Sequence, residues 1–324
     1  MLSVLAWMYG RGVALRNYLY EKGIFEVHDL GARTISVGNI TVGGTGKTPL
    51  VAYIAAELAD RGEKVCILTR GYGREDESKR VLVSDGESVL ADAVTGGDEP
   101  VELAHKLLGK AIVIADADRV GAAEWAKRKF GVTAFVLDDG FQHRKIKRDI
   151  DLVCVDATDP FGGGNLVPAG RLREPTPNLA RASVVVITRV EQVGDISDLR
   201  SQISDLAPRT KIVESRSSLS EIKTLTKGSE VRGRAFAFCG LGNPQSFFTL
   251  LAETHLEICG THALRDHQTY RQSDIDAIEK LARSAGAEAL ITTGKDAVKL
   301  AKLRSSLPVF VPDLIIQLSE PLHL

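Results

Sequence analysis

The segment Thr41-Val-Gly-Gly-Thr-Gly-Lys-Thr48 decides the fold of this 324-residue chain. It follows an apolar run at residues 34–37 and precedes a stretch of helical character that begins at Pro49. Glycines let backbone N–H groups curl around phosphate oxygens, and the N-terminus of the following helix adds a favourable dipole. Strand, glycine-rich loop and helix in this order predict a phosphate-binding loop, or P-loop.

We expect the whole loop to hold the phosphates of a nucleotide, through Thr41, Val42, Gly43, Gly44, Thr45, Gly46, Lys47 and Thr48. Lys47 is expected to reach the β- and γ-phosphates and so to take part in catalysis, and the Thr48 hydroxyl is expected to bind Mg²⁺. Thr41 stands where the general pattern has glycine. The alternative interpretation is a glycine-rich turn that binds nothing.

The rest of the chain alternates short apolar runs with stretches of helical character. Six runs rich in Val and Ile indicate buried parallel strands, at residues 34–37, 64–69, 111–115, 133–137, 152–155 and 183–187. Helices between such strands predict an α/β fold with the doubly wound, mostly parallel sheet of P-loop NTPases. A second, smaller α/β set is expected to follow, with strands near residues 235–239, 289–292 and 309–311.

This pattern predicts two domains. Residues 1–228 would form the P-loop domain, and residues 229–324 a smaller α/β domain that closes over the active site. Polar, weakly periodic sequence at residues 215–232 predicts a linker between them.

Composition narrows the functional classes. A net charge of −1 predicts no general attraction to nucleic acid. The four cysteines lack C-x-x-C spacing, which favours buried thiols in the cytoplasm over a zinc site or disulfides. The sequence contains no run of about 18 apolar residues, so no membrane-spanning helix is predicted. No protein partner is implied.

The N-terminus predicts an amphipathic helix over about residues 2–20. Its apolar stripe consists of Val4, Leu5, Met8, Leu15 and Leu19, with Arg11 and Arg16 near the edges. Such a helix suits a membrane interface, where arginines reach lipid phosphates. A helix docked on the protein's own core is the alternative.

Two acids at the end of a strand predict a metal contact beside the P-loop. Asp138 and Asp139 follow residues 133–137, where a P-loop protein places its second Mg²⁺ contact. Asp139 could instead cap the next turn. Residues 141–148 follow with five basic-type side chains, which predict either contacts to an anionic substrate or a solvated positive face.

Two further residues allow a structural or a catalytic interpretation. Asp98 lies where the N-cap of a helix is expected, and capping alone would explain it. His267 follows Asp266, which could orient its imidazole for proton transfer, although a lone histidine is more often structural. Arg119 is expected to point into the crevice of the sheet towards a phosphate.

Taken together, the chain resembles tetraacyldisaccharide 4′-kinase, the lipid A 4′-kinase of Gram-negative bacteria. Nine segments carry the resemblance: VGNITVGGTGKTP (37–49), TRGYGR (69–74), GGDEP (96–100), DADR (116–119), LDDGFQHR (137–144), PAGRLREP (168–175), GNPQSFF (242–248), DHQTY (266–270) and TTGKDAVKL (292–300). Two positions depart from it: Gly294, where glutamate is usual, and Gln268, where a second histidine is frequent.

The resemblance implies transfer of the γ-phosphate of ATP to the 4′-hydroxyl of a tetraacylated glucosamine disaccharide 1-phosphate, with Mg²⁺ as cofactor. It implies a location on the cytoplasmic face of the bacterial inner membrane. Asp98 and His267 match the family's catalytic dyad, Asp139 is assigned to catalysis, and Asp138 to the metal with Thr48. Contacts to the acceptor are expected from Tyr72, Arg119, Gln142, His143, Arg171 and Glu174.

Two other functions are compatible with the P-loop alone. A P-loop ATPase switch would hydrolyse ATP without a lipid acceptor and would not need the His267 segment. A soluble kinase of a small metabolite would not need the amphipathic N-terminus.

Overall fold

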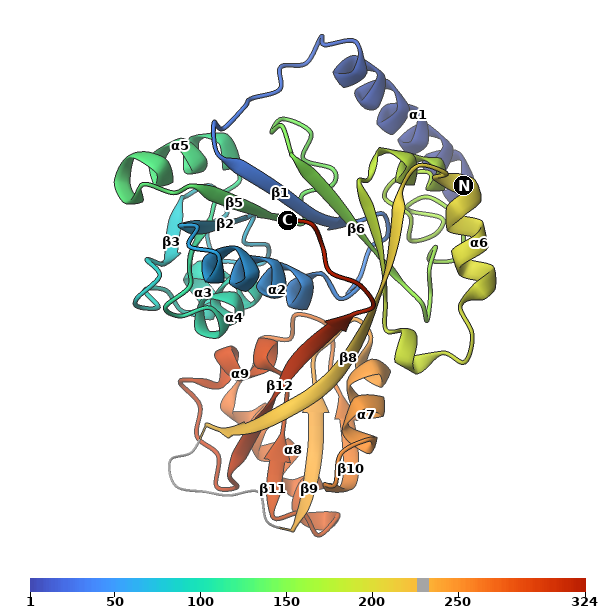
Figure 1. Ribbon diagram of the computed structural model, residues 1–324. Coiled ribbons are helices and arrows are strands. Elements are labelled where there is room, and N and C mark those ends of the chain that lie inside the picture. The colour runs from blue at the N-terminus through green and yellow to red at the C-terminus, as the bar shows by residue number, and fades with distance from the viewer. Residues whose placement is uncertain (226–232) are drawn as a thin grey trace.

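The structure is a computed structural model that describes residues 1–225 and 233–324, apart from the side chain of Glu221 (Figure 1). Its strands are β1 (Arg33–Asn39), β2 (Val65–Thr69), β3 (Val81–Ser84), β4 (Ala111–Ala115), β5 (Ala134–Asp138), β6 (Ile150–Asp156), β7 (Val184–Thr188), β8 (Lys211–Thr224), β9 (Arg234–Cys239), β10 (Glu257–Ala263), β11 (Ala289–Ile291) and β12 (Val309–Leu318). Its helices are α1 (Leu2–Glu21), α2 (Lys47–Asp60), α3 (Ala93–Gly96), α4 (Asp98–Lys106), α5 (Arg119–Phe130), α6 (Ser197–Leu206), α7 (Pro244–Ala252), α8 (Gln272–Ser284) and α9 (Gly294–Leu300), with 3₁₀ turns η1 (Thr176–Arg181) and η2 (Val190–Gln192).

All described strands belong to one sheet, in the order β10-β9-β11-β12-β8-β7-β6-β1-β5-β2-β4-β3. The six strands expected in the N-terminal half are confirmed, each to within two residues. They pair in parallel, and β3 adds an antiparallel edge. The packing explains their apolar sequence, because α2 covers one face of this half and α5 the other.

The C-terminal half repeats this architecture on a smaller scale. β9, β10, β11 and β12 form its part of the sheet, with α8 packed on one face and α7 on the other. The three strands expected here are confirmed, and β10 was missed. β10 lies at the edge of the sheet with only partly buried side chains, so its sequence lacks a strong apolar signal.

The linker expected at residues 215–232 is wrong for the part that the structure describes. Residues 215–224 are the second half of β8, which pairs with β7 at its start and with β12 along the rest (Figure 1). One face of this half is exposed serine and arginine, while Leu219 and Ile222 pack against the C-terminal core. Because this half has few apolar residues, its sequence shows only a weak alternation of polar and apolar residues, and the strand is hard to recognise from sequence. The domain boundary predicted at residue 228 lies outside the described residues.

The last residues of the chain pack on the N-terminal half. Leu322 and Leu324 are buried in the core cluster around α2, and Arg61 donates a 2.9 Å hydrogen bond to the main-chain oxygen of Leu324. Together with β8, this return ties the two halves of the molecule to each other.

Helix α1 lies along the outside of the N-terminal half (Figure 1). It contacts the protein through Ala6, Val13 and Asn17, which are buried, and through Gly10, where a Cβ atom would lie 2.7 Å from Leu166. Its large apolar side chains are exposed: Leu2, Val4, Leu5, Trp7, Met8, Tyr9, Leu15 and Tyr18. The helix is thus docked through small residues and presents an apolar outer face. None of the described helices is long and apolar enough to cross a membrane.

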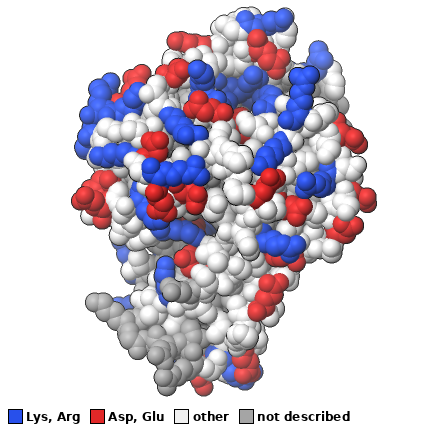
Figure 2. All heavy atoms as spheres, viewed as in Figure 1, with Lys and Arg blue, Asp and Glu red and all other residues white. Residues whose placement is uncertain are grey.

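Acidic and basic side chains are interspersed over the face of the molecule in Figure 2, in keeping with a net charge of −1.

Candidate active site

The P-loop joins β1 to α2 and is held by side chains at the ends of β1 and β7. Asn39 donates a 3.0 Å hydrogen bond to the Thr45 hydroxyl, and the Thr188 hydroxyl donates one of 2.9 Å to the Thr45 carbonyl. Gly46 has a φ of 77°, and a Cβ atom there would lie 3.3 Å from Thr188, so glycine is required. Lys47 is the first residue of α2.

The loop at residues 159–177 lies against the start of the P-loop. Thr41 forms a β-bridge with Leu172, and the backbone N–H of Val42 donates a 2.7 Å hydrogen bond to the Arg171 carbonyl. This pairing explains why threonine is accepted where the general motif has glycine, because Thr41 is buried in extended backbone.

A cavity of about 1500 Å³ opens beside the P-loop and extends between the two halves of the molecule. Residues 42–48 line it from one side, together with both acids at the end of β5. From the other side it is lined by side chains of α4, α9 and the loop after β10. The lining includes Glu99, Glu102, Asp138, Asp139, Asp266, His267 and Lys295.

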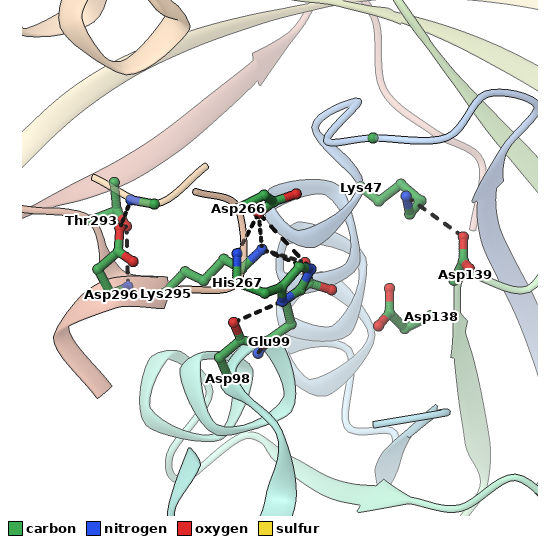
Figure 3. A network of polar contacts seen from close by, with 12 residues as sticks. Lys47, Asp98, Glu99, Asp138, Asp139, Asp266, His267, Thr293, Lys295 and Asp296 are labelled. Atoms are coloured by element: carbon green, nitrogen blue, oxygen red, sulfur yellow. Dashed lines mark hydrogen bonds and ion pairs between the residues drawn. The ribbon is translucent and has the colours of Figure 1, made fainter. Parts of the chain in front are cut away.

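Asp139 connects the P-loop lysine to the loop at residues 159–177. Its carboxylate accepts hydrogen bonds of 2.7 and 2.9 Å from Arg173. Lys47 Nζ lies 3.6 Å from its Oδ1 (Figure 3). Burial by itself would raise the pKa of Asp139, but Lys47 and Arg173 outweigh it and lower the pKa to about 2. Asp139 is therefore ionised and orients Lys47.

Asp138, the last residue of β5, is in a different state. Its carboxylate is buried, and the Thr69 hydroxyl donates a 3.0 Å hydrogen bond to it. Burial raises its pKa to about 6, and the nearby charges of Glu99 and Asp139 add to the effect. The charges of Lys47 and Arg119 oppose this rise without outweighing it, so the buried carboxylate is suited to a further cation.

Asp98 and His267 meet between the two halves of the molecule. His267 Nδ1 donates a 3.0 Å hydrogen bond to Asp98 Oδ2 (Figure 3). This hydrogen bond raises the pKa of His267. Burial works against ionisation of Asp98, but His267, Lys295 and Lys299 outweigh it and lower the pKa. The two groups are therefore joined by a hydrogen bond to an ionised carboxylate, and His267 faces the cavity.

The capping interpretation of Asp98 does not fit this geometry. Gly97 is the N-cap of α4, and Asp98 is the first residue inside the helix. Its Oδ1 accepts only from the adjacent Glu99 N–H, at 2.9 Å. His267 in turn has a φ of 55°, a conformation that is costly for a residue with a side chain and common at functional sites.

Two lysines of α9, for which the sequence predicted no role, complete the charge network. Lys295 Nζ lies 3.1 Å from Asp266, 3.3 Å from Glu99 and 3.3 Å from His267 Nε2. Lys299 Nζ lies 3.6 Å from Asp98 Oδ2. Both lysines are nearly buried. Their spacing of four residues places both on one face of the short helix α9, and this spacing is the signal that could have identified them.

Three of the six predicted acceptor contacts lie at the site. Arg119 is buried, lines the large cavity and donates a 3.2 Å hydrogen bond to the Asp139 carbonyl. The exposed Tyr72 lies edge-on to the His267 ring at 5.6 Å. Arg171 lies 2.9 Å from Asp159 and lines a smaller cavity of about 580 Å³ that also borders the P-loop.

The other three residues predicted to contact the acceptor, Gln142, His143 and Glu174, do not line the large cavity. Glu174 is fully buried, where it binds Asn178 and Arg181 and accepts a 3.1 Å hydrogen bond from Asn17 of α1. Gln142 donates to the Asn39 carbonyl at 2.9 Å. Burial and neighbouring cations lower the pKa of His143 to about 3.

A phosphate-binding loop and an acid–imidazole pair on either side of one cavity can place the γ-phosphate of a nucleotide beside a proton acceptor. This arrangement on a doubly wound sheet defines a P-loop phosphotransferase. The chain belongs to the tetraacyldisaccharide-1-P 4′-kinase family, whose model matches residues 1–321.

Individual relatives agree over nearly the whole length. The chain is 38% identical to a tetraacyldisaccharide 4′-kinase of Halothermothrix orenii (93% of this chain, 83% of the relative) and 39% identical to one of Geobacter metallireducens (99% and 94%). Among solved structures, LpxK from Aquifex aeolicus in complex with ATP matches with a TM-score of 0.76 and 30% identity, over 98% of this chain and 93% of that one. The expected fold class and family are confirmed, and the chain is an ATP-dependent kinase.

Proposed function

We propose that this chain transfers the γ-phosphoryl group of ATP to the 4′-hydroxyl of a tetraacylated glucosamine disaccharide 1-phosphate, a step of lipid A and hence lipopolysaccharide biosynthesis. The names of its relatives supply the acceptor. The observation that carries the proposal is the hydrogen-bonded pair of Asp98 and His267, which lies across the cavity from the P-loop. An ATPase switch without an acceptor would not need such a pair.

Lys47 and the P-loop hold the transferred phosphoryl group. The backbone N–H groups of residues 42–48 and the Lys47 ammonium bind the phosphates, so that charge developing on the γ-phosphate is stabilised by groups already in place. Asp139 fixes Lys47 for this task, and Arg173 fixes Asp139. Arg119 and Tyr72 contact the acceptor headgroup where it enters the cavity.

The donor set beside the P-loop fits Mg²⁺. Thr48 and Asp138 line the same cavity and offer a hydroxyl and a carboxylate oxygen, the ligands that this cation prefers. No group of three or more His, Cys, Asp or Glu side chains in the described part of the chain could hold a metal alone. That suits an ion whose other ligands are phosphate oxygens and water. When bound, Mg²⁺ would neutralise charge on the β- and γ-phosphates.

The proton of the acceptor hydroxyl passes to the Asp98–His267 pair. His267, which faces the cavity, takes this proton at Nε2 as a neutral imidazole, and the proton on its Nδ1 passes to Asp98, the final acceptor, through the 3.0 Å hydrogen bond. The hydrogen bond from His267 and the charges of Lys295 and Lys299 lower the pKa of Asp98, so its carboxylate is ionised and can accept a proton.

The outer face of α1 contacts the membrane from which the lipid acceptor is taken, at the cytoplasmic face of the inner membrane. Eight large apolar side chains are exposed on this helix. Ile24, Phe25 and Val27, in the segment that follows the helix, are exposed as well.

Mass spectrometry of the lipid disaccharide 1-phosphate, incubated with ATP, Mg²⁺ and the protein, tests the function. We expect a product with one added phosphoryl group that appears only when all three are present. ATP hydrolysis at the same rate without acceptor, and no phosphorylated lipid, would instead support the ATPase switch.

A further inference from the structure

Gly294 and Glu102 face each other where α9 packs against α4. Gly294 is the first residue of α9. A Cβ atom at Gly294 would lie 2.7 Å from Oε1 of Glu102 and 3.2 Å from its carboxyl carbon. The Glu102 carboxylate therefore occupies the space that a side chain at position 294 would need.

This contact lies next to the acid–imidazole pair. Glu102 follows Asp98 by four residues on α4, so both project from the same side of the helix. Gly294 immediately precedes Lys295, which contacts His267, Asp266 and Glu99. Glu102 and Gly294 also line the large cavity, so the contact lies at its wall.

The charges around Glu102 come from both helices. Asp98, Glu99 and Lys106 approach it from α4, and Lys295 approaches it from α9. Burial raises the pKa of Glu102 to about 7, Glu99 adds to this effect, and Lys106 and Lys295 oppose it. Asp98 and Lys295 are the two of these groups that contact His267. Lys295 alone of the two belongs to α9, so its ammonium links Glu102 to the pair through its charge.

We propose that Glu102 is a positioning residue for the phosphoryl transfer. Its carboxylate, seated against Gly294, holds the start of α9 so that Lys295 stays against His267. Position 294 is where the resemblance leads one to expect glutamate. In this chain Glu102 of the facing helix places its carboxylate against position 294, and glycine leaves the room for it. This inference rests on the proposed kinase function.

The test moves the carboxylate from one helix to the other. Glu102→Ala should lower kcat about tenfold through the lost coupling to Lys295, with little change in KM for ATP. Gly294→Glu alone forces two carboxylates into one space and should lower both kcat and Tm. The double variant Glu102→Ala/Gly294→Glu again has one carboxylate there and should recover most of kcat. Losses that simply multiply in the double variant would overturn the proposal.

Gly294→Ala separates this effect from a change in helix propensity. It should lower Tm and kcat in the wild-type background, where the methyl group meets Glu102, and should be harmless or stabilising in Glu102→Ala. The same loss in both backgrounds would contradict the pairing. Absence of lipid phosphorylation by the unaltered chain would instead contradict the proposed function.

A pH profile supplies a readout that a purely structural role would not change. Glu102→Gln keeps the size of the side chain but cannot ionise. The wild-type kcat should rise as Glu102 ionises around pH 7, and the Gln variant should lack that part of the rise. An identical profile and an unchanged kcat in Glu102→Gln would overturn the assignment.

Discussion

Asp98 Oδ2 and His267 Nδ1 lie 3.0 Å apart although 169 residues separate them along the chain. Asp98 begins α4 in the N-terminal half, and His267 lies in the loop after β10 in the C-terminal half. The pair therefore exists only when the two halves are packed together. A residue that acts merely as a helix cap would not depend on that packing.

Asp98→Asn should lower kcat by roughly 10²–10⁴-fold with little change in KM for ATP, because the amide cannot accept the proton. Steady-state kinetics with both substrates measures this. Asp92→Asn is a matched control, since Asp92 is an aspartate that does cap a helix, by accepting from the Thr95 N–H. If both variants remain equally active, Asp98 has no role as a base.

The same pair should be visible in the titration of His267. The hydrogen bond to Asp98 raises the pKa of His267, so Asp98→Asn should return that pKa towards its ordinary value of 6.5. NMR titration of the imidazole checks the direction. A pKa that is the same in both proteins would show that the contact is absent in solution.

The contact between Asp98 and His267 should also make the unfolding free energy depend on pH. The pKa of Asp98 is lowered in the folded state. Its contribution to the unfolding free energy is therefore fully present above pH 3.8, the ordinary pKa, and is lost as pH falls through the folded-state pKa. The pKa of His267 is raised in the folded state. Its contribution to the unfolding free energy is therefore fully present below pH 6.5, the ordinary pKa, and is lost as pH rises through the folded-state pKa. The difference in unfolding free energy between wild type and Asp98→Asn should therefore be larger at pH 5 than at pH 9, as urea unfolding would measure.

Asp138→Asn should weaken the dependence of kcat on Mg²⁺, because a neutral amide is a poor ligand for this cation. Wild-type affinity for Mg²⁺ should also fall as pH decreases through about 6, where Asp138 becomes protonated. The Asn variant should lack that part of the pH dependence. An unchanged Mg²⁺ titration in the variant would assign the metal to another acid.

The apolar face of α1 should bind anionic vesicles. Deleting the helix is a poor test, because Asn17 and Tyr9 hydrogen-bond the segment at Glu174 and Arg173. Leu5→Ser/Met8→Ser instead changes only exposed side chains. We expect release from vesicles in a flotation assay and a KM that rises far more for the lipid than for ATP. Leu281→Ser, at an equally exposed leucine of α8, should change neither.

Glu174 should prove structural rather than substrate-binding. Glu174→Gln removes a fully buried charge and leaves Arg181 without its partner, which should cost about 3 kcal/mol of unfolding free energy. Glu124→Gln, which removes an exposed pair with Arg128, should cost little. Unchanged stability in Glu174→Gln with a raised KM for the acceptor would restore the role expected from sequence.

Local signals made much of the fold predictable. A buried parallel strand needs an apolar run, and a phosphate loop needs glycines between strand and helix, so β1, β5 and the P-loop could be located from residues alone. β8 could not be located in this way, because its second half is stabilised by pairing with β12, a strand almost a hundred residues further along the chain. β10 was missed for a related reason: an edge strand buries little.

The sequence by itself determined the phosphate site, the acids that follow β5, the apolar N-terminal helix and, through nine ordered segments, the family. These features depend on residues that are close together in the chain. Tertiary structure alone decided which side chains meet: that His267 bonds Asp98 and faces the cavity, that Lys295 joins them, and that Glu174 is buried under α1. Electrostatic and hydrogen-bond energies depend on distances of a few ångströms between distant segments, and only the packing of the two halves sets those distances.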